Sequence, residues 1–303
     1  MQSAPGHFPA PNTRSAEAMD VCTTAADLKR RISDLRVRRR VAFVPTMGNL
    51  HTGHLRLMER ARDHADIVIA SIYVNPLQFG PGEDFAAYPR TPAADLALLR
   101  NAGVDLLFLP SDAEVYPRGQ SAQTFVEVPG LSDILCGAFR PGHFRGVTTV
   151  VNRLLHLVAP ETALFGKKDY QQWLLIRLMV GDLGMPVEIV GVETERAADG
   201  LALSSRNGYL TESERRVAPL LFATLRALKD QAEQVGADLP QAETRAIAAL
   251  ATHGFRPDYL SIRRRADLAP PAPGDRELVA LAAAWLGRAR LLDNVELNLP
   301  GSD

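Results

Sequence analysis

The sequence predicts an α/β fold, a doubly wound parallel sheet of Rossmann type with a second, smaller α+β domain at the C-terminal end. Short apolar runs rich in β-branched residues alternate with segments of helical periodicity. The runs are apolar throughout, which is typical of strands buried on both faces of a parallel sheet. After about residue 192 the pattern changes to alanine-rich helical stretches followed by strand-like runs. At ~150 residues per domain, a chain of 303 residues has room for both units.

Three segments are expected along the chain. Residues 1–20 contain Pro5, Pro9 and Pro11 without an apolar period, and we expect a flexible N-terminal extension. Residues 21–192 form the Rossmann-type domain, and residues 193–303 form the smaller α+β domain.

The first domain begins with a helix over Ala25–Arg40, where Leu28, Ile32 and Leu35 share one face and basic residues cover the other. Strands and further helices then alternate, so right-handed crossovers are expected. The predicted strands are Val41–Val44 (ended by Pro45), Ile67–Val74, Val104–Leu109, Ala163–Phe165 and Val187–Val192. The predicted helices are Thr52–His64, Pro92–Ala102, Val147–Val158 and Tyr170–Leu183.

The second domain begins with two alanine-rich helices joined through Gly236 and ends with three strands. The helices are expected over Glu212–Gln234 and Pro240–Thr252, and the strands over Tyr259–Ile262, Leu278–Trp285 and Arg290–Leu297.

Composition excludes several functional classes. The chain is 46% hydrophobic and 23% charged, which is close to a soluble average. No apolar run reaches ~18 residues, so we expect no membrane partner. With a net charge of −1, no nucleic-acid partner is expected. The two cysteines, Cys22 and Cys136, cannot form a disulfide framework, which favours a cytoplasmic location.

The segment Pro45–His54, PTMGNLHTGH, joins the first predicted strand to a helix. Ligands bind at such strand ends in open α/β sheets, and the N-terminus of the following helix favours an anion. Gly48 and Gly53 lack Cβ atoms and let a ligand approach the backbone. Thr52 is the expected cap of the helix. His51 and His54 can point to the same side, so the pair predicts a phosphate-binding site.

Other nucleotide-binding signatures are absent. No G-x-G-x-x-G follows the first strand, and the segment Gly166–Asp169 lacks the earlier glycine and the Ser or Thr of a P-loop. The H-x-G-H pattern itself resembles that of a nucleotidyltransferase superfamily, which moves a nucleotide by attack on the α-phosphate. Gly166–Asp169 and Ser204–Asn207 are candidates for the second, basic phosphate-binding signature of that superfamily.

Together, the motifs resemble the pantothenate synthetase (pantoate–β-alanine ligase, AMP-forming) family over roughly residues 25–298. The matching segments are PTMGNLHTGH (45–54), YVNPLQFGPGEDFAAYPRT (73–91), LCGAFRPGHFRGVTTVV (135–151), LFGKKDYQQ (164–172), DGLALSSRNGYL (199–210) and RLLDN (290–294).

The resemblance implies a role for each matching residue. The residues that would bind ATP are Met47, Gly48, Asn49, Leu50, His51, Thr52, Gly53, His54, Gly166, Lys167, Lys168, Asp169, Glu195, Leu203, Ser204, Ser205 and Arg206. Those expected to act in catalysis are His54 as proton donor, His51, Lys168, Ser204, Ser205 and Arg206. The substrates would be bound by Gln78, which contacts pantoate and β-alanine, by Gln172, which contacts pantoate, and in supporting roles by Asn75, Arg140 and His143.

The resemblance also implies the activity: condensation of pantoate with β-alanine, using ATP as co-substrate and Mg²⁺, through an acyl adenylate. A homodimer is implied as well, and the residues that bind magnesium stay unassigned. The main alternative is another H-x-G-H enzyme that adenylylates a different carboxylate. A silent nucleotide-binding module or a nicotinamide-dependent oxidoreductase fits less well, because the phosphate-binding segments are intact and the glycine fingerprint is missing.

Overall fold

The computed structural model describes residues 19–300, so the predicted extension lies outside the described residues except for Met19 and Asp20. Met19 is buried, and Asp20 begins a strand, β1, that the sequence analysis did not predict.

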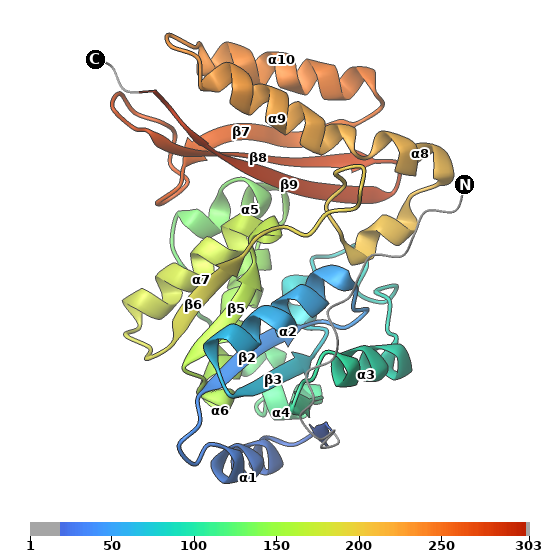
Figure 1. The fold of residues 1–303 in the computed structure, drawn as a ribbon, viewed down its shortest axis with the longest axis vertical. Helices are drawn as coiled ribbons and strands as arrows, with labels where there is room; N and C mark the ends of the chain where they lie inside the picture. Colours follow the sequence, from blue (N-terminus) through green and yellow to red (C-terminus); the bar gives the residue numbers. More distant parts are fainter. Residues whose placement is uncertain (1–18, 301–303) are drawn as a thin grey trace.

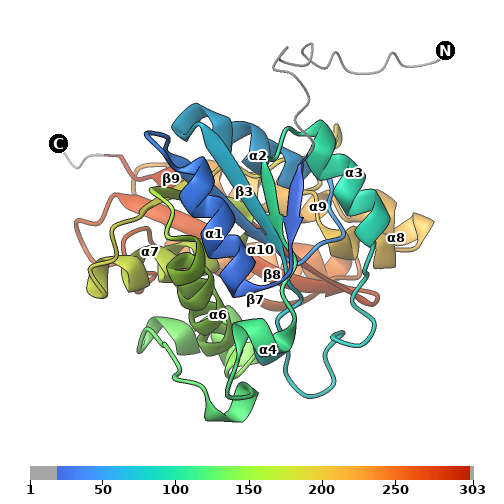
Figure 2. The ribbon, with the colours of Figure 1, turned by 90° about the horizontal axis from the view of Figure 1, so that it is seen from below.

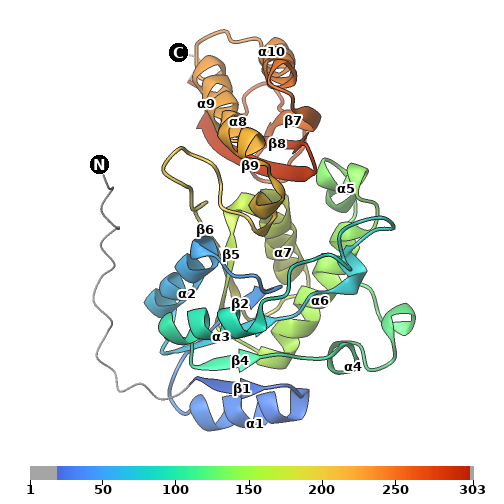
Figure 3. The ribbon, with the colours of Figure 1, turned by 90° about the vertical axis from the view of Figure 1, so that its right-hand side faces the viewer.

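Six parallel strands form the larger sheet, in the order β1-β4-β3-β2-β5-β6. Figure 1 labels β3, β2, β5 and β6, and Figure 3 labels β1 and β4. Their bounds are β1 (Asp20–Cys22), β2 (Val41–Thr46), β3 (Ile67–Ile72), β4 (Leu106–Phe108), β5 (Thr162–Gly166) and β6 (Glu188–Val192). The doubly wound parallel sheet of the sequence analysis is therefore confirmed.

Helices cover both faces of this sheet (Figure 3). One face carries α1 (Ala25–Leu35), α6 (His143–Val158) and α7 (Tyr170–Asp182), and the other carries α2 (Thr52–His64) and α3 (Pro92–Asn101). Figure 2 shows α1 beside α6. Alternate residues of β2 supply the two cores: Val41 and Phe43 face α1 and α6, whereas Ala42 and Val44 face α2. Burial on both faces explains why the strands are apolar throughout.

Short helical turns occupy the connections. They are α4 (Asp112–Val115), α5 (Cys136–Phe139), and the 3₁₀ turns η1 (Pro76–Gln78), η2 (Gln120–Ala122), η3 (Leu131–Asp133), η4 (Lys167–Asp169) and η5 (Ser205–Tyr209).

Several predicted boundaries were wrong in the first half of the chain. Helix α1 ends at Leu35 and not at Arg40, and β3 and β4 are shorter than predicted. Pro45 lies within β2 instead of ending it. β2 pairs with β5 only through Ala42 and Phe43, so the strand loses no ladder hydrogen bond to β5 at Pro45. Helix α6 begins at His143, earlier than predicted, because Gly142 adopts a left-handed conformation and starts the helix there.

The C-terminal part is a three-stranded antiparallel sheet, β7-β8-β9, with helices on its outer face (Figure 1). The bounds are β7 (Arg256–Arg264), β8 (Glu277–Leu286), β9 (Ala289–Asn298), α8 (Glu212–Val217), α9 (Leu220–Ala232) and α10 (Leu239–Thr252). The single helix predicted over Glu212–Gln234 is wrong. Pro219 lacks the N–H that an unbroken helix requires and separates α8 from α9.

Strand β8 joins the two parts of the molecule. Leu278 and Ala280 pack in the core under α9 and α10, whereas Val279 and Leu281 face the core of the larger unit. The strand is therefore buried on both sides and contributes side chains to the space between the two sheets.

The strand order reverses at β2, whose neighbours are β3 and β5. Ligands of open α/β sheets bind in the crevice outside the carboxyl ends of the strands at such a point. None of the helices among residues 19–300 has the length and apolar character that crossing a bilayer requires.

Candidate active site

A cavity of about 220 Å³ opens at the carboxyl ends of β2 and β5, and the C-terminal sheet forms its far wall through Tyr259, Leu281 and Leu292. Ten of the predicted site residues line it: Met47, His54, Asn75, Gln78, Arg140, His143, Lys168, Asp169, Gln172 and Arg206. Segments spread over more than a hundred residues of sequence thus meet at the carboxyl end of β2, where the strand order reverses.

The two histidines of PTMGNLHTGH form the N-terminal cap of α2. His51 Nδ1 accepts from the N–H of Gly53 at 3.1 Å, and His54 Nδ1 accepts from the N–H of His51 at 3.3 Å. The expectation that Thr52 caps the helix was therefore wrong. The N-cap position is His51, and Thr52 is the first residue of the helix itself. The two imidazoles, and not the Thr52 hydroxyl, accept from the backbone N–H groups that the first turn leaves without a partner.

This capping decides the chemistry of both rings. An Nδ1 that accepts a backbone N–H carries no proton, so each neutral ring carries its proton on Nε2. Burial, together with the nearby Lys168, lowers the pKa of His51 to about 4. Burial, together with His51, lowers the pKa of His54 to about 3. The ring centroids are 4.1 Å apart. At neutral pH the pair is uncharged, with Nε2–H groups free to donate.

The loop before the histidines is held by a carboxylate that the sequence analysis missed. Asp95, buried in the first turn of α3, accepts from the N–H groups of Asn49 at 2.9 Å and Leu50 at 2.8 Å. Gly48 has a φ of +80°, a conformation that favours glycine. A Cβ on Gly53 would lie 2.9 Å from the ring of His51, so this glycine makes room for the cap.

Lys168 reaches the cavity from η4, and its backbone is held from the opposite sheet. The side-chain amide of Asn294, on β9, donates to the carbonyl oxygens of Lys167 at 2.8 Å and Lys168 at 3.0 Å. The Lys167 side chain turns away from the cavity and pairs with Glu193 at 2.6 Å. Only one lysine of the pair is therefore available to a ligand in the cavity.

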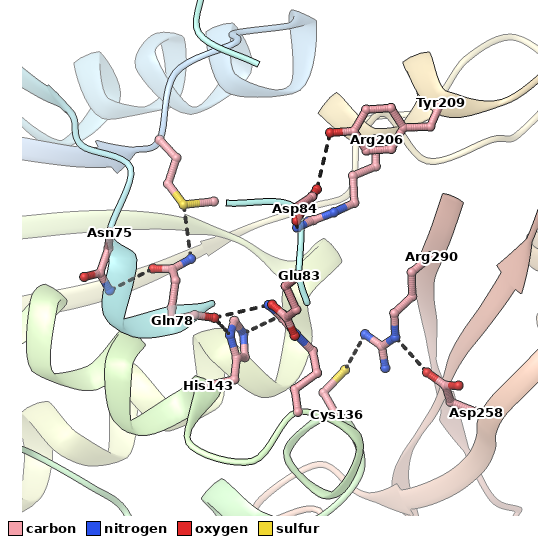
Figure 4. A network of polar contacts seen from close by, with 12 residues as sticks. Asn75, Gln78, Glu83, Asp84, Cys136, His143, Arg206, Tyr209, Asp258 and Arg290 are labelled. Carbon is pink, nitrogen blue, oxygen red and sulfur yellow. Dashed lines mark hydrogen bonds and ion pairs between the residues drawn. The ribbon is translucent and has the colours of Figure 1, made fainter. Parts of the chain in front are cut away.

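The segment Ser204–Arg206 lies against the H-x-G-H loop. Ser205 Oγ donates to the carbonyl of Asn49 at 3.1 Å. Arg206 Nη2 lies 3.1 Å from Asp84 Oδ1, and the other carboxylate oxygen of Asp84 accepts from Tyr209 at 3.3 Å (Figure 4). The two basic segments that the sequence singled out are thus brought to one end of the cavity.

The other end of the cavity is made of amides and one ion pair. Glu83 accepts from Arg140 Nε at 2.7 Å. Burial alone would raise the pKa of Glu83, but the Arg140 guanidinium outweighs burial and holds that pKa below its usual value. Arg140 Nη1 donates to His143 Nε2 at 3.0 Å, so His143 carries its proton on Nδ1 and donates to the backbone oxygen of Gln78 at 2.8 Å. Burial and Arg140 lower the pKa of His143 to about 3. Figure 4 shows this network.

Several predicted residues do not line the cavity. Ser204 lines a small adjoining cavity, and Glu195 lines a surface groove between α2 and β6. Other predicted residues absent from the cavity wall are Gly48, Asn49, Leu50, His51, Thr52, Gly53, Gly166, Lys167, Leu203 and Ser205.

Several residues that hold the site were missed by the sequence analysis, among them Asp84, Asn294 and Asp95. Asp84 and Asn294 lie inside the quoted segments 73–91 and 290–294, so a closer reading of those segments could have found them. Asp95 lies outside the quoted segments and carries no local signal.

Fold and cavity define the class of the molecule: an α/β protein of the doubly wound, nucleotide-binding type, with an H-x-G-H loop where the strand order reverses. The chain belongs to the pantoate-beta-alanine ligase family, whose model matches residues 20–296.

Individual relatives agree with this assignment. The chain is 61% identical over 257 residues to a pantothenate synthetase of Shewanella amazonensis, covering 84% of this chain and 90% of the relative. It is 53% identical over 282 residues to that of Stutzerimonas stutzeri, covering 93% and 99%.

Solved structures are similar as well. The crystal structure of pantothenate synthetase from Thermus thermophilus has a TM-score of 0.86 at 49% identity, covering 93% of this chain and 100% of that one. A pantoate-beta-alanine ligase from Francisella tularensis, complexed with beta-gamma ATP and beta-alanine, has a TM-score of 0.76 at 32% identity, covering 92% and 97%.

Proposed function

We propose that the protein condenses pantoate with β-alanine at the expense of ATP, giving pantothenate, AMP and pyrophosphate. The observation that carries this proposal is one cavity with a cationic, histidine-capped end suited to a triphosphate and an amide-lined end suited to a hydroxylated carboxylate. Membership of the pantoate-beta-alanine ligase family supports the same reaction.

In the first step, a carboxylate oxygen of pantoate attacks the α-phosphorus of ATP. The bond from that phosphorus to the bridging oxygen breaks, and pyrophosphate leaves with the bonding electrons. Lys168 and Arg206 neutralise the charge on the departing phosphates, and Ser204 and Ser205 donate hydrogen bonds to them.

His51 and His54 act in this step as neutral donors through Nε2–H. The sequence analysis assigned proton donation to His54. Its low pKa instead favours hydrogen-bond donation to phosphate oxygen without full proton transfer. Met47 and Asp169 line the nucleotide site, and Gly48–Leu50, Gly53, Gly166, Leu203 and Glu195 support it from beside the cavity.

In the second step, the neutral amine of β-alanine attacks the acyl carbon of the adenylate. AMP leaves, and the new amide forms as the nitrogen loses a proton. Gln78 and Gln172 hold pantoate oxygens without adding charge, and Asn75, Arg140 and His143 keep Gln78 in place. The enzyme thus works mainly by positioning two substrates against an activated carboxyl group.

Mg²⁺ enters the proposal with ATP. Among residues 19–300, no three His, Cys, Asp or Glu side chains converge as a metal cage would require. This fits a magnesium ion that arrives on the triphosphate and keeps most of its water, with Asp169 as the carboxylate available in the cavity. Bound there, it would neutralise phosphate charge.

We further propose a cytoplasmic homodimer with domains over residues 21–192 and 193–303. The unpaired thiols of Cys22 and Cys136 support a reducing compartment. The division falls where β6, the last strand of the parallel sheet, ends at Val192.

The test is to mix the purified protein with ATP, Mg²⁺ and D-pantoate, with and without β-alanine, and to follow pyrophosphate and AMP. We expect pyrophosphate only when pantoate is present, and sustained AMP release only when β-alanine is added. A protein that binds ATP but releases no pantoate-dependent pyrophosphate would refute the proposal, and a screen of other carboxylates would follow.

A further inference from the structure

A buried chain of side chains connects Tyr116 to the amide-lined end of the cavity. The Tyr116 hydroxyl lies 2.7 Å from Asn75 Oδ1, and Asn75 Nδ2 lies 3.1 Å from Gln78 Oε1. Tyr116 and Asn75 are 2% and 1% exposed, so water does not replace these contacts. Figure 4 shows the step from Asn75 to Gln78.

Two backbone groups determine which way the Asn75 amide points. The carbonyl of Gly146 can only accept, and it lies 3.1 Å from one end of the amide, which must therefore be Nδ2. The N–H of Leu77 can only donate, and it lies 3.3 Å from the other end, which must be Oδ1. The Tyr116 hydroxyl, which faces Oδ1, is consequently the donor.

The same reasoning passes to Gln78. The atom of Gln78 that receives the N–H of Asn75 must be Oε1, so Nε2 is the opposite end of the amide. That Nε2 lies 3.1 Å from the Sδ of Met47, a weak acceptor that lines the cavity. The backbone of Gln78 is held independently, because its carbonyl accepts from Arg140 and His143.

We infer that Tyr116 is a positioning residue which, through Asn75, holds the Gln78 amide with its N–H groups toward the cavity. Gln78 then recognises an oxygen acceptor, a carboxylate or hydroxyl oxygen of the substrate, and does not accept a hydrogen bond from the β-alanine amine. This inference rests on the proposed role of Gln78 in substrate binding.

The first experiment compares Tyr116→Phe with wild type in steady-state kinetics. The variant keeps the ring and removes one donor, so we expect the KM for D-pantoate to rise about 3- to 10-fold, the range of one buried hydrogen bond. The KM for ATP should stay unchanged. Tyr73→Phe is the matched control: its ring packs edge-on against Tyr116, but its hydroxyl donates to Asp112.

A second variant, Gln78→Glu, tests the direction of the amide itself. It replaces the N–H end by a carboxylate oxygen, which cannot donate, so D-pantoate affinity measured by calorimetry should fall about 100-fold. ATP affinity should stay near wild type, and retained ATP binding shows that the variant is folded. Unchanged pantoate affinity in Gln78→Glu would overturn the inference. An unchanged pantoate KM in Tyr116→Phe, or an equal rise in both KM values, would overturn it too. Failure of the proposed function would give a different result from failure of this inference, because the wild-type protein itself would then show no pantoate-dependent turnover.

Discussion

The two ends of the cavity are built in different ways. At the end that contains Lys168 and Arg206, which we propose binds phosphate and call the phosphate end, both residues are held by contacts between residues 21–192 and residues 193–303. Asn294 of the C-terminal sheet holds Lys168, and Asp84 holds Arg206. At the amide end, Asn75 and Gln78 are buried in the larger unit and bonded to fixed neighbours.

The difference follows from the ligands that each end would bind. Buried amides cost free energy unless every donor and acceptor is paired, so the amide end must be organised before the substrate arrives. A guanidinium can exchange one anionic partner for another, so the phosphate end can be held by a carboxylate that phosphate then replaces. The polar groups of one end are paired before the substrate arrives, whereas the other end can exchange its anionic partner.

The largest effect is expected at His54, which we propose donates to the reacting phosphate. His54→Ala removes a donor aimed at the cavity, and kcat should fall about 10²- to 10³-fold, or about 2.7–4 kcal/mol of barrier. Pyrophosphate release in single-turnover assays measures this step. His156→Ala, an exposed histidine of α6, is the control and should match wild type. A folded His54→Ala variant with near-normal kcat would contradict the role.

A pH effect of intermediate size is expected from the buried imidazoles. The pKa of His143 is lowered to about 3, whereas an unfolded histidine has a pKa of ~6.5. As pH falls below ~6.5, the unfolded chain takes up a proton that the folded protein refuses, so stability is lost progressively toward the folded pKa. At pH 5 the loss is about 2 kcal/mol for each such histidine.

Denaturant unfolding at pH 7 and pH 5 checks this effect. The loss of stability between the two should be about 2 kcal/mol smaller in His143→Gln than in wild type. His156→Gln should leave the pH dependence unchanged. Equal pH dependence in His143→Gln and wild type would show that His143 is not held neutral.

A smaller effect is expected at the contact that holds the phosphate end from the opposite sheet. Asn294→Ala removes both hydrogen bonds to the backbone of Lys167 and Lys168, so the KM for ATP should rise about 10-fold, or about 1.4 kcal/mol, with the KM for pantoate unchanged. Asn298→Ala, an exposed position on the same strand, is the control. A rise in pantoate KM instead would break the distinction between the two ends.

The smallest effect tests whether the charged end is exchangeable. Asp84→Asn weakens the ion pair with Arg206 and frees the guanidinium for phosphate, so the KM for ATP should fall about 2- to 5-fold, in keeping with a partly exposed ion pair. Asp63→Asn, on the outer surface of α2, is the control. A higher KM for ATP in Asp84→Asn would mean that Asp84 helps to bind the nucleotide.

Most of the fold was predictable because its signals are local. Helix α2 begins and ends where predicted, at Thr52 and His64. The loop motif before it marks its start, and the apolar periodicity marks the face that packs on the sheet. Pro219 and Pro45 show the limit of such rules. One proline breaks a helix and the other lies within a strand, and only the pairing of the neighbouring strand decides the second case.

Local patterns were enough to predict five of the six strands of the parallel sheet, the long helices that cover it, and the residues of the H-x-G-H and basic segments, because periodicity and side-chain chemistry can be seen within a few residues. Tertiary structure alone decided which nitrogen of each histidine carries the proton, which end of Gln78 faces the cavity, and that Asn294 holds the backbone of Lys168. Each of these three features depends on a hydrogen bond in which the partner residue decides which atom donates and which accepts. For Tyr116 and Asn294, the partner lies 41 and 126 residues away along the chain, so no local pattern records it.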